Sequence, residues 1–380
     1  MPAPLRSIEI SPMADSSQLV VLAAHGLYDY SGRPRRFLDA VPLPAQGRAL
    51  IGAWFQNDEQ LECDYHRKQC GVLRRLSTAF RLVWQNYATL RRARMIYCLS
   101  GMHYTVLLLL SRWGLFRTEG KIIRRVVYHD TALQRLASKL RKASPAFQVE
   151  CITFEQFATT SHRLGAHRVV LRPWKIDTVW FQPEDDAPKT RALLPGNISR
   201  DESMVAPLLH SGLSITRIAR IDSLQARFAA EIANPRFELV LNASHREYLE
   251  HLHAAPMVLL PIVACDNPAG LTAAMEAISA GVPVLANHSM GLTELFSECR
   301  YPVPMLNNLD PDAWARAYHQ IEGQRDSPDF LAALENSRQL LLKRHSILPA
   351  GEDWVQIFAE ACAADSVVCE AAFGAASSPA

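Results

Sequence analysis

The chain has 380 residues, of which 49% are hydrophobic and 21% are charged, a balance typical of globular proteins and not of disordered ones. This length allows two domains, each with its own core. No stretch approaches the roughly 18 consecutive apolar residues that span a bilayer, and the start of the chain lacks the basic and apolar segments of a signal peptide. An integral membrane protein and a secreted protein are therefore not expected.

Eight cysteines are scattered along the chain without a Cys-x-x-Cys pair or a nearby paired histidine. Several lie in apolar surroundings, such as Cys98 in Met-Ile-Tyr-Cys-Leu. We interpret them as reduced core residues and not as disulfides or zinc ligands, which indicates a cytosolic protein.

The net charge of +2 conceals a strong segregation of charge. Seventeen Lys and Arg but only two acids, Glu119 and Asp130, lie between residues 67 and 142. This predicts a basic face with an anionic partner, although a solvated basic helix without a partner is the alternative. Segments 81–87 and 109–117 mix Trp, Tyr and Phe with arginine, as helices at a lipid interface do, so an anionic membrane surface is favoured over nucleic acid. Arg124, Arg125, Arg141 and Lys142 are expected to contact it.

Strands and helices alternate through the first half of the chain. Strands are predicted at 19–24, 95–99, 125–128 and 147–152, and helices at 66–92, at 104–115 and ahead of Lys142. Such alternation predicts an α/β fold with a parallel sheet covered on both faces. A Pro- and Asp-rich connector at 172–188 then marks the best domain boundary.

A second alternating set follows the connector. Strands are predicted at 191–194, 214–220, 237–241, 257–260 and 284–285, and helices near 201–210, 223–233, 246–254, 271–280, 311–322, 328–343 and 353–362. Asp310 and Asp312 have the spacing of a metal-binding pair, but they stand where a helix begins and are better interpreted as a cap.

The most informative segment is 256–285, which predicts a strand, a loop ending at Gly270, a short helix and another strand. The backbone N–H groups and the positive dipole end at such a helix start favour a phosphate. Glu276 lies inside this otherwise apolar helix, where a carboxylate that faces a cleft can accept hydrogen bonds from ribose hydroxyls. An ordinary surface glutamate is the alternative.

Two further positions have the residue types of a ligand site. Gly196 permits close approach of a ligand to the backbone, and Arg200, or less clearly Arg217, is a candidate for holding a phosphate. Asp201 or Ser199 is expected to cap the helix that follows. His129 stands at the end of a predicted strand, the edge where open α/β sheets bind ligands, as a proton relay or a structural histidine.

Two motifs resemble a known family. The pattern Ala-Gly-Leu-Thr-Ala-Ala-Met-Glu-Ala-Ile-Ser-Ala-Gly-Val-Pro-Val at 269–284, after Asp266 and before Gly291-Leu-Thr-Glu, is similar to the donor-site signature of GT-B glycosyltransferases. The connector Ile-Asp-Thr-Val-Trp-Phe-Gln-Pro at 176–183 resembles the hinge motif of the retaining family four. The second acid of that family falls on Pro268 here, and Asp266 is the nearest substitute.

The resemblance implies two Rossmann-like domains with parallel sheets facing across a cleft. The corresponding ranges are an acceptor-side domain at 1–175, a linker at 176–190, a nucleotide-sugar domain at 191–345, a helix crossing back at 346–364 and a disordered tail at 365–380. It further implies that Gly270, Leu271 and Thr272 face the diphosphate or sugar, and that Glu276 binds the ribose with Asp266 as the second acid. Gly196, Asn197 and Arg200 would line the phosphate side. Gly26 and His129 would face the acceptor.

The resulting hypothesis is a cytoplasmic glycosyltransferase, peripheral to the inner face of the plasma membrane. It would transfer a hexose-type sugar from a UDP- or GDP-sugar to a lipid-linked or glycan acceptor of cell-envelope polysaccharide or lipopolysaccharide synthesis, with retention, without a metal or other cofactor and without nucleic acid as a partner. One alternative is a degenerate GT-B protein that binds a nucleotide sugar or a partner without turnover, and another is a GT-B epimerase.

Overall fold

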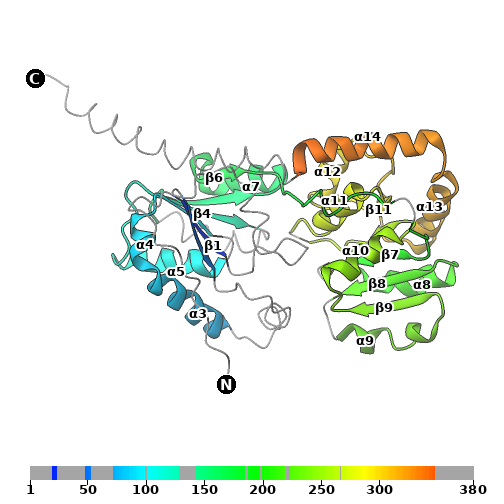
Figure 1. Cartoon of the computed structure of the whole chain (residues 1–380), viewed down its shortest axis with the longest axis horizontal. Helices are drawn as coiled ribbons and strands as arrows, with labels where there is room; N and C mark the ends of the chain where they lie inside the picture. The colour runs from blue at the N-terminus through cyan, green and yellow to red at the C-terminus, as the bar shows by residue number, and fades with distance from the viewer. Residues whose placement is uncertain are drawn as a thin grey trace, which may run out of the picture. The chain divides into compact units, whose positions relative to one another are not determined.

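The computed structural model describes residues 19–23, 48–52, 72–98, 101–127, 143–184, 187–196, 199–219, 223–265 and 267–346. These residues belong to two compact units, each with its own sheet (Figure 1). The first unit holds the described residues up to Ile152 together with Gln156–Arg172, and the second holds Thr153–Glu155 and the described residues from Pro173 onward.

The first unit contains a six-stranded sheet of order β2-β1-β3-β4-β5-β6, in which all neighbouring strands are parallel. Its strands are β1 (Leu19–Ala23), β2 (Arg48–Gly52), β3 (Met95–Cys98), β4 (Ile122–Val127), β5 (Phe147–Cys151) and β6 (Val169–Leu171). Its described helices are α3 (Val72–Gln85), α4 (Tyr87–Arg92), α5 (Gly101–Arg112) and α7 (Phe154–Leu164).

The core of the first unit forms where α3 and α5 pack together beside the sheet (Figure 1). Leu107 and Leu110 of α5 are buried with Val83 of α3. The Tyr104 ring meets the Phe147 ring of β5 edge-on, with the centroids 5.4 Å apart. All four residues of β3 are buried, as expected for a central parallel strand with both faces covered.

The second unit contains a five-stranded parallel sheet of order β11-β10-β7-β8-β9. Its strands are β7 (Ala192–Pro195), β8 (Ile215–Ala219), β9 (Phe237–Leu241), β10 (Val258–Leu260) and β11 (Val284–Ala286). Its helices are α8 (Val205–His210), α9 (Ser223–Arg227), α10 (His245–His253), α11 (Leu271–Ser279), α12 (Leu292–Glu298), α13 (Pro311–Gln324) and α14 (Pro328–His345).

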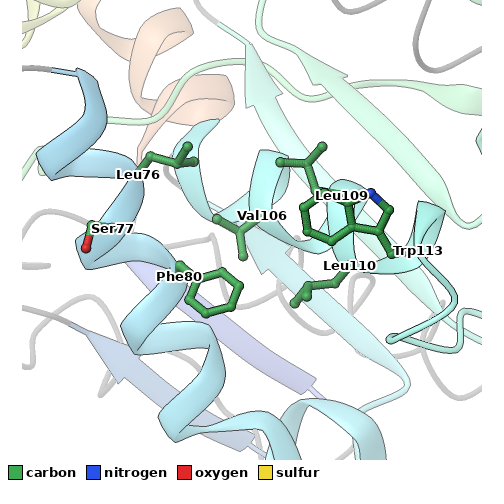
Figure 2. A pocket seen from close by; sticks show the side chains of 7 residues that line it. All are labelled: Leu76, Ser77, Phe80, Val106, Leu109, Leu110 and Trp113. Carbon is green, nitrogen blue, oxygen red and sulfur yellow. The ribbon is translucent and has the colours of Figure 1, made fainter.

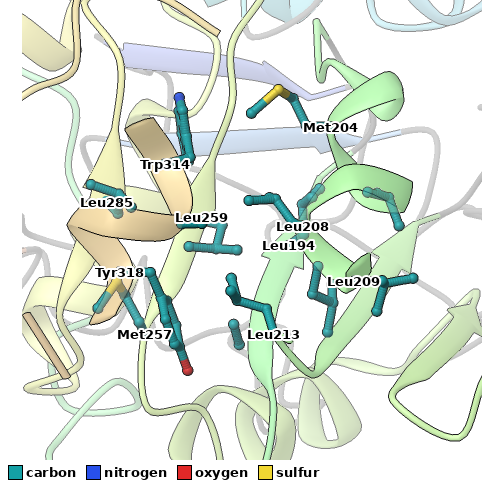
Figure 3. Close-up of a cluster of buried hydrophobic side chains, with 14 of the residues drawn as sticks. Leu194, Met204, Leu208, Leu209, Leu213, Met257, Leu259, Leu285, Trp314 and Tyr318 are labelled. Atoms are coloured by element: carbon teal, nitrogen blue, oxygen red, sulfur yellow. The ribbon is translucent and has the colours of Figure 1, made fainter. Parts of the chain in front are cut away.

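Both faces of this sheet are buried. On one face Leu259 and Leu285 share a cluster with Trp314 and Tyr318 of α13 and with residues of α8 (Figure 3). On the other face Leu193, Val258 and Val284 stand in register and have no exposed surface. Helix α11 packs against α14, and its Ala274 and Ala277 are fully buried.

The predicted α/β class with parallel sheets is confirmed. As predicted, Asp310 caps α13 by accepting the backbone N–H groups of Asp312 and Ala313. Strands β2 and β6 and helices α7 and α12 were not predicted. The helix expected at 353–362 and the tail lie outside the described residues, and the domain ranges derived from the connector remain predictions. In the part of the chain that is described, no helix is long and apolar enough to cross a membrane.

Candidate functional site

Two loops meet at the carboxyl edge of the second sheet, where the neighbouring strands β7 and β10 end. Arg200, in the loop after β7, forms an antiparallel bridge with Ile262, in the loop after β10. The N–H of Asp201 donates to the Pro261 carbonyl at 2.8 Å, and the N–H of Val263 donates to the Ser199 carbonyl at 3.0 Å. The backbone therefore fixes the segment that carries Arg200 at the edge where parallel sheets bind ligands.

The Arg200 guanidinium lies directly over the first of these loops. Its Nε donates to the Pro195 carbonyl at 2.7 Å. A Cβ on Gly196 would lie 2.6 Å from Arg200 Nη2, and Gly196 has a φ of +103°, so only glycine accommodates this arrangement. Burial and the neighbouring Arg217 lower the Arg200 pKa to about 10, while Tyr248 and Glu202 raise it. The group thus remains a cation at neutral pH in a site where an anion would stabilise it.

Arg217 is the alternative phosphate ligand suggested by the sequence, and the structure overturns that role. Its side chain is fully buried and forms a two-pronged ion pair with Glu202, with Nη2–Oε1 at 2.6 Å and Nε–Oε2 at 2.9 Å. Its Nη1 donates to the carbonyls of Leu194 and Ile218. Arg217 therefore stabilises the junction of β7 and β8.

Helix α11 begins at Gly270, which is left-handed with a φ of +84°. A Cβ there would lie 3.1 Å from Ile262 Cδ1 and 3.4 Å from Leu292 Cδ1, so both the conformation and the space require glycine. Leu271, Ala274, Met275 and Ile278 form the buried side of this helix.

The two residues after Gly270 differ in what they present to solvent. Leu271 is buried and its N–H donates to the Pro268 carbonyl, whereas Thr272 is exposed in the first turn. Of the predicted Gly270, Leu271 and Thr272 trio, only Thr272 therefore offers a side chain at the surface.

Glu276 lies in the second turn of α11, is 7% exposed and is therefore not an ordinary surface glutamate. The Tyr248 hydroxyl, from α10, donates to Glu276 Oε2 at 2.9 Å. The Tyr248 ring in turn meets the buried Phe181 ring, with the centroids 6.3 Å apart and the planes at 72°. Ser279 Oγ donates to the Phe181 carbonyl at 2.6 Å. Phe181 of the connector thus packs against Tyr248, and the Tyr248 hydroxyl orients the Glu276 carboxylate.

Asn287, directly after β11, is like Tyr248 a residue of the site that the sequence did not indicate. Its side-chain oxygen accepts the N–H of Ile262 at 2.7 Å, and its side-chain nitrogen donates to the Ile262 carbonyl at 2.9 Å. This reciprocal pair fixes the loop that both bridges Arg200 and packs against Gly270.

A row of buried polar side chains crosses the first sheet. Tyr97 donates to Glu150, whose Oε2 lies 3.1 Å from Arg172 Nε. Arg124 donates to Gln148 Oε1 at 2.9 Å and is only 2% exposed. The expectation that Arg124 contacts a membrane is therefore wrong, because its guanidinium stabilises the interior of the sheet.

Four predicted site residues lie outside the part of the chain that the structure describes. These are Gly26, His129, Asn197 and Asp266, and their roles remain predictions.

The described cysteines, Cys98, Cys151, Cys265 and Cys299, form no disulfide, in agreement with their interpretation as thiols. Among the described side chains, His, Cys, Asp and Glu form no group of three that could hold a metal ion.

The described site combines three chemical features at one sheet edge. Arg200 supplies a half-buried cation, the N-terminus of α11 supplies a positive dipole end, and Glu276 supplies a carboxylate held by Tyr248. The first two suit an anion such as a diphosphate, and the third suits the hydroxyl groups of a ribose or sugar.

No family model and no curated protein sequence matches the chain. Solved structures do match. A glycosyltransferase from Rickettsia africae aligns over 92% of this chain and 99% of its own with a TM-score of 0.63 at 10% identity. Sucrose-phosphate synthase from Thermosynechococcus elongatus aligns over 90% of this chain and 100% of its own with a TM-score of 0.63 at 18% identity.

A third match is a pneumococcal O-GlcNAc transferase in complex with UDP and GlcNAc, with a TM-score of 0.53 at 14% identity over 76% of this chain and 60% of its own. At these identities the similarity concerns the fold. The chain has the GT-B fold of these glycosyltransferases, and the resemblance noted in the sequence is confirmed at that level.

Proposed function

We propose that the chain is a glycosyltransferase that moves a hexose-type sugar from a UDP- or GDP-sugar to a lipid-linked or glycan acceptor. The observation that carries this proposal is the joint position of Arg200, the glycine-opened start of α11 and the Tyr248–Glu276 pair at one sheet edge. The GT-B fold agrees with it, and the pneumococcal structure similar in fold was determined with UDP and GlcNAc bound.

In this proposal each described group has a distinct task. Arg200 and the first turn of α11 bind the diphosphate, and they stabilise the charge that develops on it as the bond to the sugar breaks. Glu276 accepts hydrogen bonds from the ribose hydroxyls, and Tyr248 keeps its carboxylate in position. Thr272, exposed beside Gly270, contacts the phosphate or sugar.

The finer parts of the proposal rest on the family resemblance. Retention of anomeric configuration, turnover without a metal ion, and a role for His129 and Gly26 toward the acceptor follow from it. The basic and aromatic first unit favours an acceptor at the cytoplasmic face of an anionic membrane, in cell-envelope polysaccharide or lipopolysaccharide synthesis.

A second candidate is a protein of the same fold that binds a nucleotide sugar without turnover. Pro268 favours it, because this residue occupies the position of the family's second acid. Both candidates predict donor binding, and only the first predicts consumption of the donor.

A panel of nucleotide sugars separates these possibilities. The purified chain is melted with UDP-, GDP- and ADP-sugars, and the correct donor at about 100 times its Kd should stabilise the fold by about 2.7 kcal/mol. Release of the nucleoside diphosphate with a lipid or glycan acceptor then identifies the transferase. Stabilisation without release favours the binding protein, and the absence of stabilisation by every nucleotide sugar would contradict both.

A further inference from the structure

The surface formed by the outer face of α3 and the residues at the end of α5 exposes large apolar side chains. Phe80, Trp84, Trp113 and Leu115 are 41%, 58%, 64% and 52% exposed. All four lie within 36 residues of sequence, with Phe80 and Trp84 on α3 and with Trp113 and Leu115 just after α5, which packs against α3. A cluster of this kind marks an interaction site, because single exposed apolar residues are usually dispersed. We call this surface the α3–α5 face.

An apolar cavity of about 310 Å³ opens between the two helices (Figure 2). The lining residues are Leu76, Ser77 and Phe80 from α3, Val106, Leu109 and Leu110 from α5, and Trp113 just after it. Val106 and Leu110 are buried, whereas Phe80 and Trp113 are exposed. The cavity is therefore a groove with an apolar floor and aromatic edges, and Ser77 is its one polar lining residue.

The exposed rings of Phe80 and Trp84 are held in place by neighbouring rings. Phe80 stacks on Trp84 with the centroids 6.0 Å apart and the planes at 11°. Trp84 contacts Tyr87 at 5.8 Å, and Tyr87 meets the buried Phe116 edge-on at 6.0 Å. Tyr87 also donates a hydrogen bond to the Leu115 carbonyl. Little side-chain entropy is thus lost when a partner covers these rings.

Exposed arginines are close in sequence to the apolar residues of this face. Arg81 follows Phe80 and Arg112 precedes Trp113, and Glu119 is the single acid of the segments 72–98 and 101–127. Arg81, Arg112 and Arg117 are exposed, and none of them forms an ion pair with a carboxylate of the described residues. An apolar, aromatic surface with a cationic border complements lipid tails below a layer of anionic headgroups.

We propose that the α3–α5 face docks on anionic phospholipid bilayers. Phe80, Trp84, Trp113 and Leu115 enter the interface, the groove receives part of an acyl chain, and the arginines contact lipid phosphates. The inference names the membrane partner of the proposed transferase and rests on that proposal for its biological role. Single-stranded nucleic acid fits less well, since Phe80 and Trp84 stack on each other and the groove offers little to hydrogen-bond to a base.

Co-sedimentation of the full chain with vesicles tests the proposal. Vesicles of phosphatidylcholine mixed with phosphatidylglycerol are compared with phosphatidylcholine alone, and only the anionic vesicles should bind strongly. Leu115→Ser should weaken binding several-fold, and the Trp84→Ser/Trp113→Ser double variant about tenfold or more, because each removes apolar area from the interface. The matched control is Leu331→Ser on α14, where Leu331 is 51% exposed against 52% for Leu115; this control should bind as the wild type does.

The charges are tested separately. Arg81→Gln and Arg112→Gln should each weaken binding to the anionic vesicles about fivefold, the equivalent of about 1 kcal/mol per residue near the surface. Arg316→Gln, which removes an exposed arginine of α13, should leave it unchanged.

Three results would overturn the proposal. The first is equal vesicle binding by the wild type and the Trp84→Ser/Trp113→Ser variant. The second is self-association of the wild type that this variant abolishes, which would assign the face to a second copy of the chain. The third is binding of single-stranded RNA in preference to anionic vesicles. Thermal melting with the nucleotide sugar distinguishes failure of this proposal from failure of the proposed function. A variant that loses vesicle binding should still be stabilised against melting by the nucleotide sugar. A wild type that no nucleotide sugar stabilises can still bind vesicles.

Discussion

Arg200 and Arg217 differ in burial and in position, because Arg217 is fully buried on β8 whereas Arg200 is half-buried in the loop after β7. The charge of Arg217 is compensated by Glu202, and its Nη1 donates to two carbonyls, so its removal would leave the partly buried Glu202 carboxylate without this cation. The Nε of Arg200 donates to the Pro195 carbonyl, and burial and Arg217 lower its pKa to about 10. A phosphate beside Arg200 would restore that pKa toward its usual value, and we therefore assign Arg200, and not the fully buried Arg217, to the ligand.

Glu276→Gln tests the carboxylate at the centre of the site. The amide keeps the size of the side chain but removes the charge that a ribose hydroxyl would contact, and one charged hydrogen bond is worth about 1.5–3 kcal/mol. Sugar transfer or donor hydrolysis should therefore fall at least about tenfold, while the melting temperature without ligand changes little. Glu250→Gln, an exposed glutamate on α10, is the control. Unaltered turnover in Glu276→Gln would remove this residue from the site.

At the scale of elements, α11 was predictable because its features are local. Gly270 before it, Gly281 after it and the small alanines between them predict a short helix packed closely on its surroundings, and the structure has it at Leu271–Ser279. The contacts that orient the site were not predictable in this way. Tyr248 lies 28 residues from Glu276, and Asn287 lies 25 residues from Ile262, so only the tertiary fold brings each pair together.

Gly270→Ala tests the start of α11. The backbone is left-handed there and a Cβ would press on Ile262 and Leu292, so the change should destabilise the fold by about 1–2 kcal/mol and weaken donor binding. The matched change is Gly323→Ala in α13, where a Cβ meets nothing within 4 Å and alanine should stabilise the helix by about 0.5–1 kcal/mol. Urea denaturation measures both. Similar changes in the two variants would show that Gly270 has no special conformational role.

Two of the elements that the sequence did not predict, β2 and α7, lack a clear pattern. Strand β2 is Arg-Ala-Leu-Ile-Gly, a short run bounded by a charge and a glycine. Helix α7 carries two threonines, a serine and a histidine among few apolar residues. Both are stabilised by their neighbours in the fold, as propensity alone does not favour them.

For the whole molecule, the order of strands and helices was enough to predict two parallel α/β sheets, and the structure confirms them. The charge pattern predicted a basic face with an anionic partner, which stays a prediction, and it misassigned Arg124, because sequence alone did not show that β4 places this arginine inside the sheet. The aromatic segments predicted a lipid interface, which stays a prediction, and the structure adds a groove and ring contacts at these segments.

The central claim is that the carboxyl edge of the second sheet binds the nucleoside diphosphate of an activated sugar. A crystal structure of the chain with UDP or GDP, whichever the panel selects, tests it most directly. The account predicts the diphosphate within hydrogen-bond distance of Arg200 and the first turn of α11, with a ribose hydroxyl on Glu276. A nucleotide bound elsewhere, with Arg200 and Glu276 making only the contacts they make without it, would contradict the account.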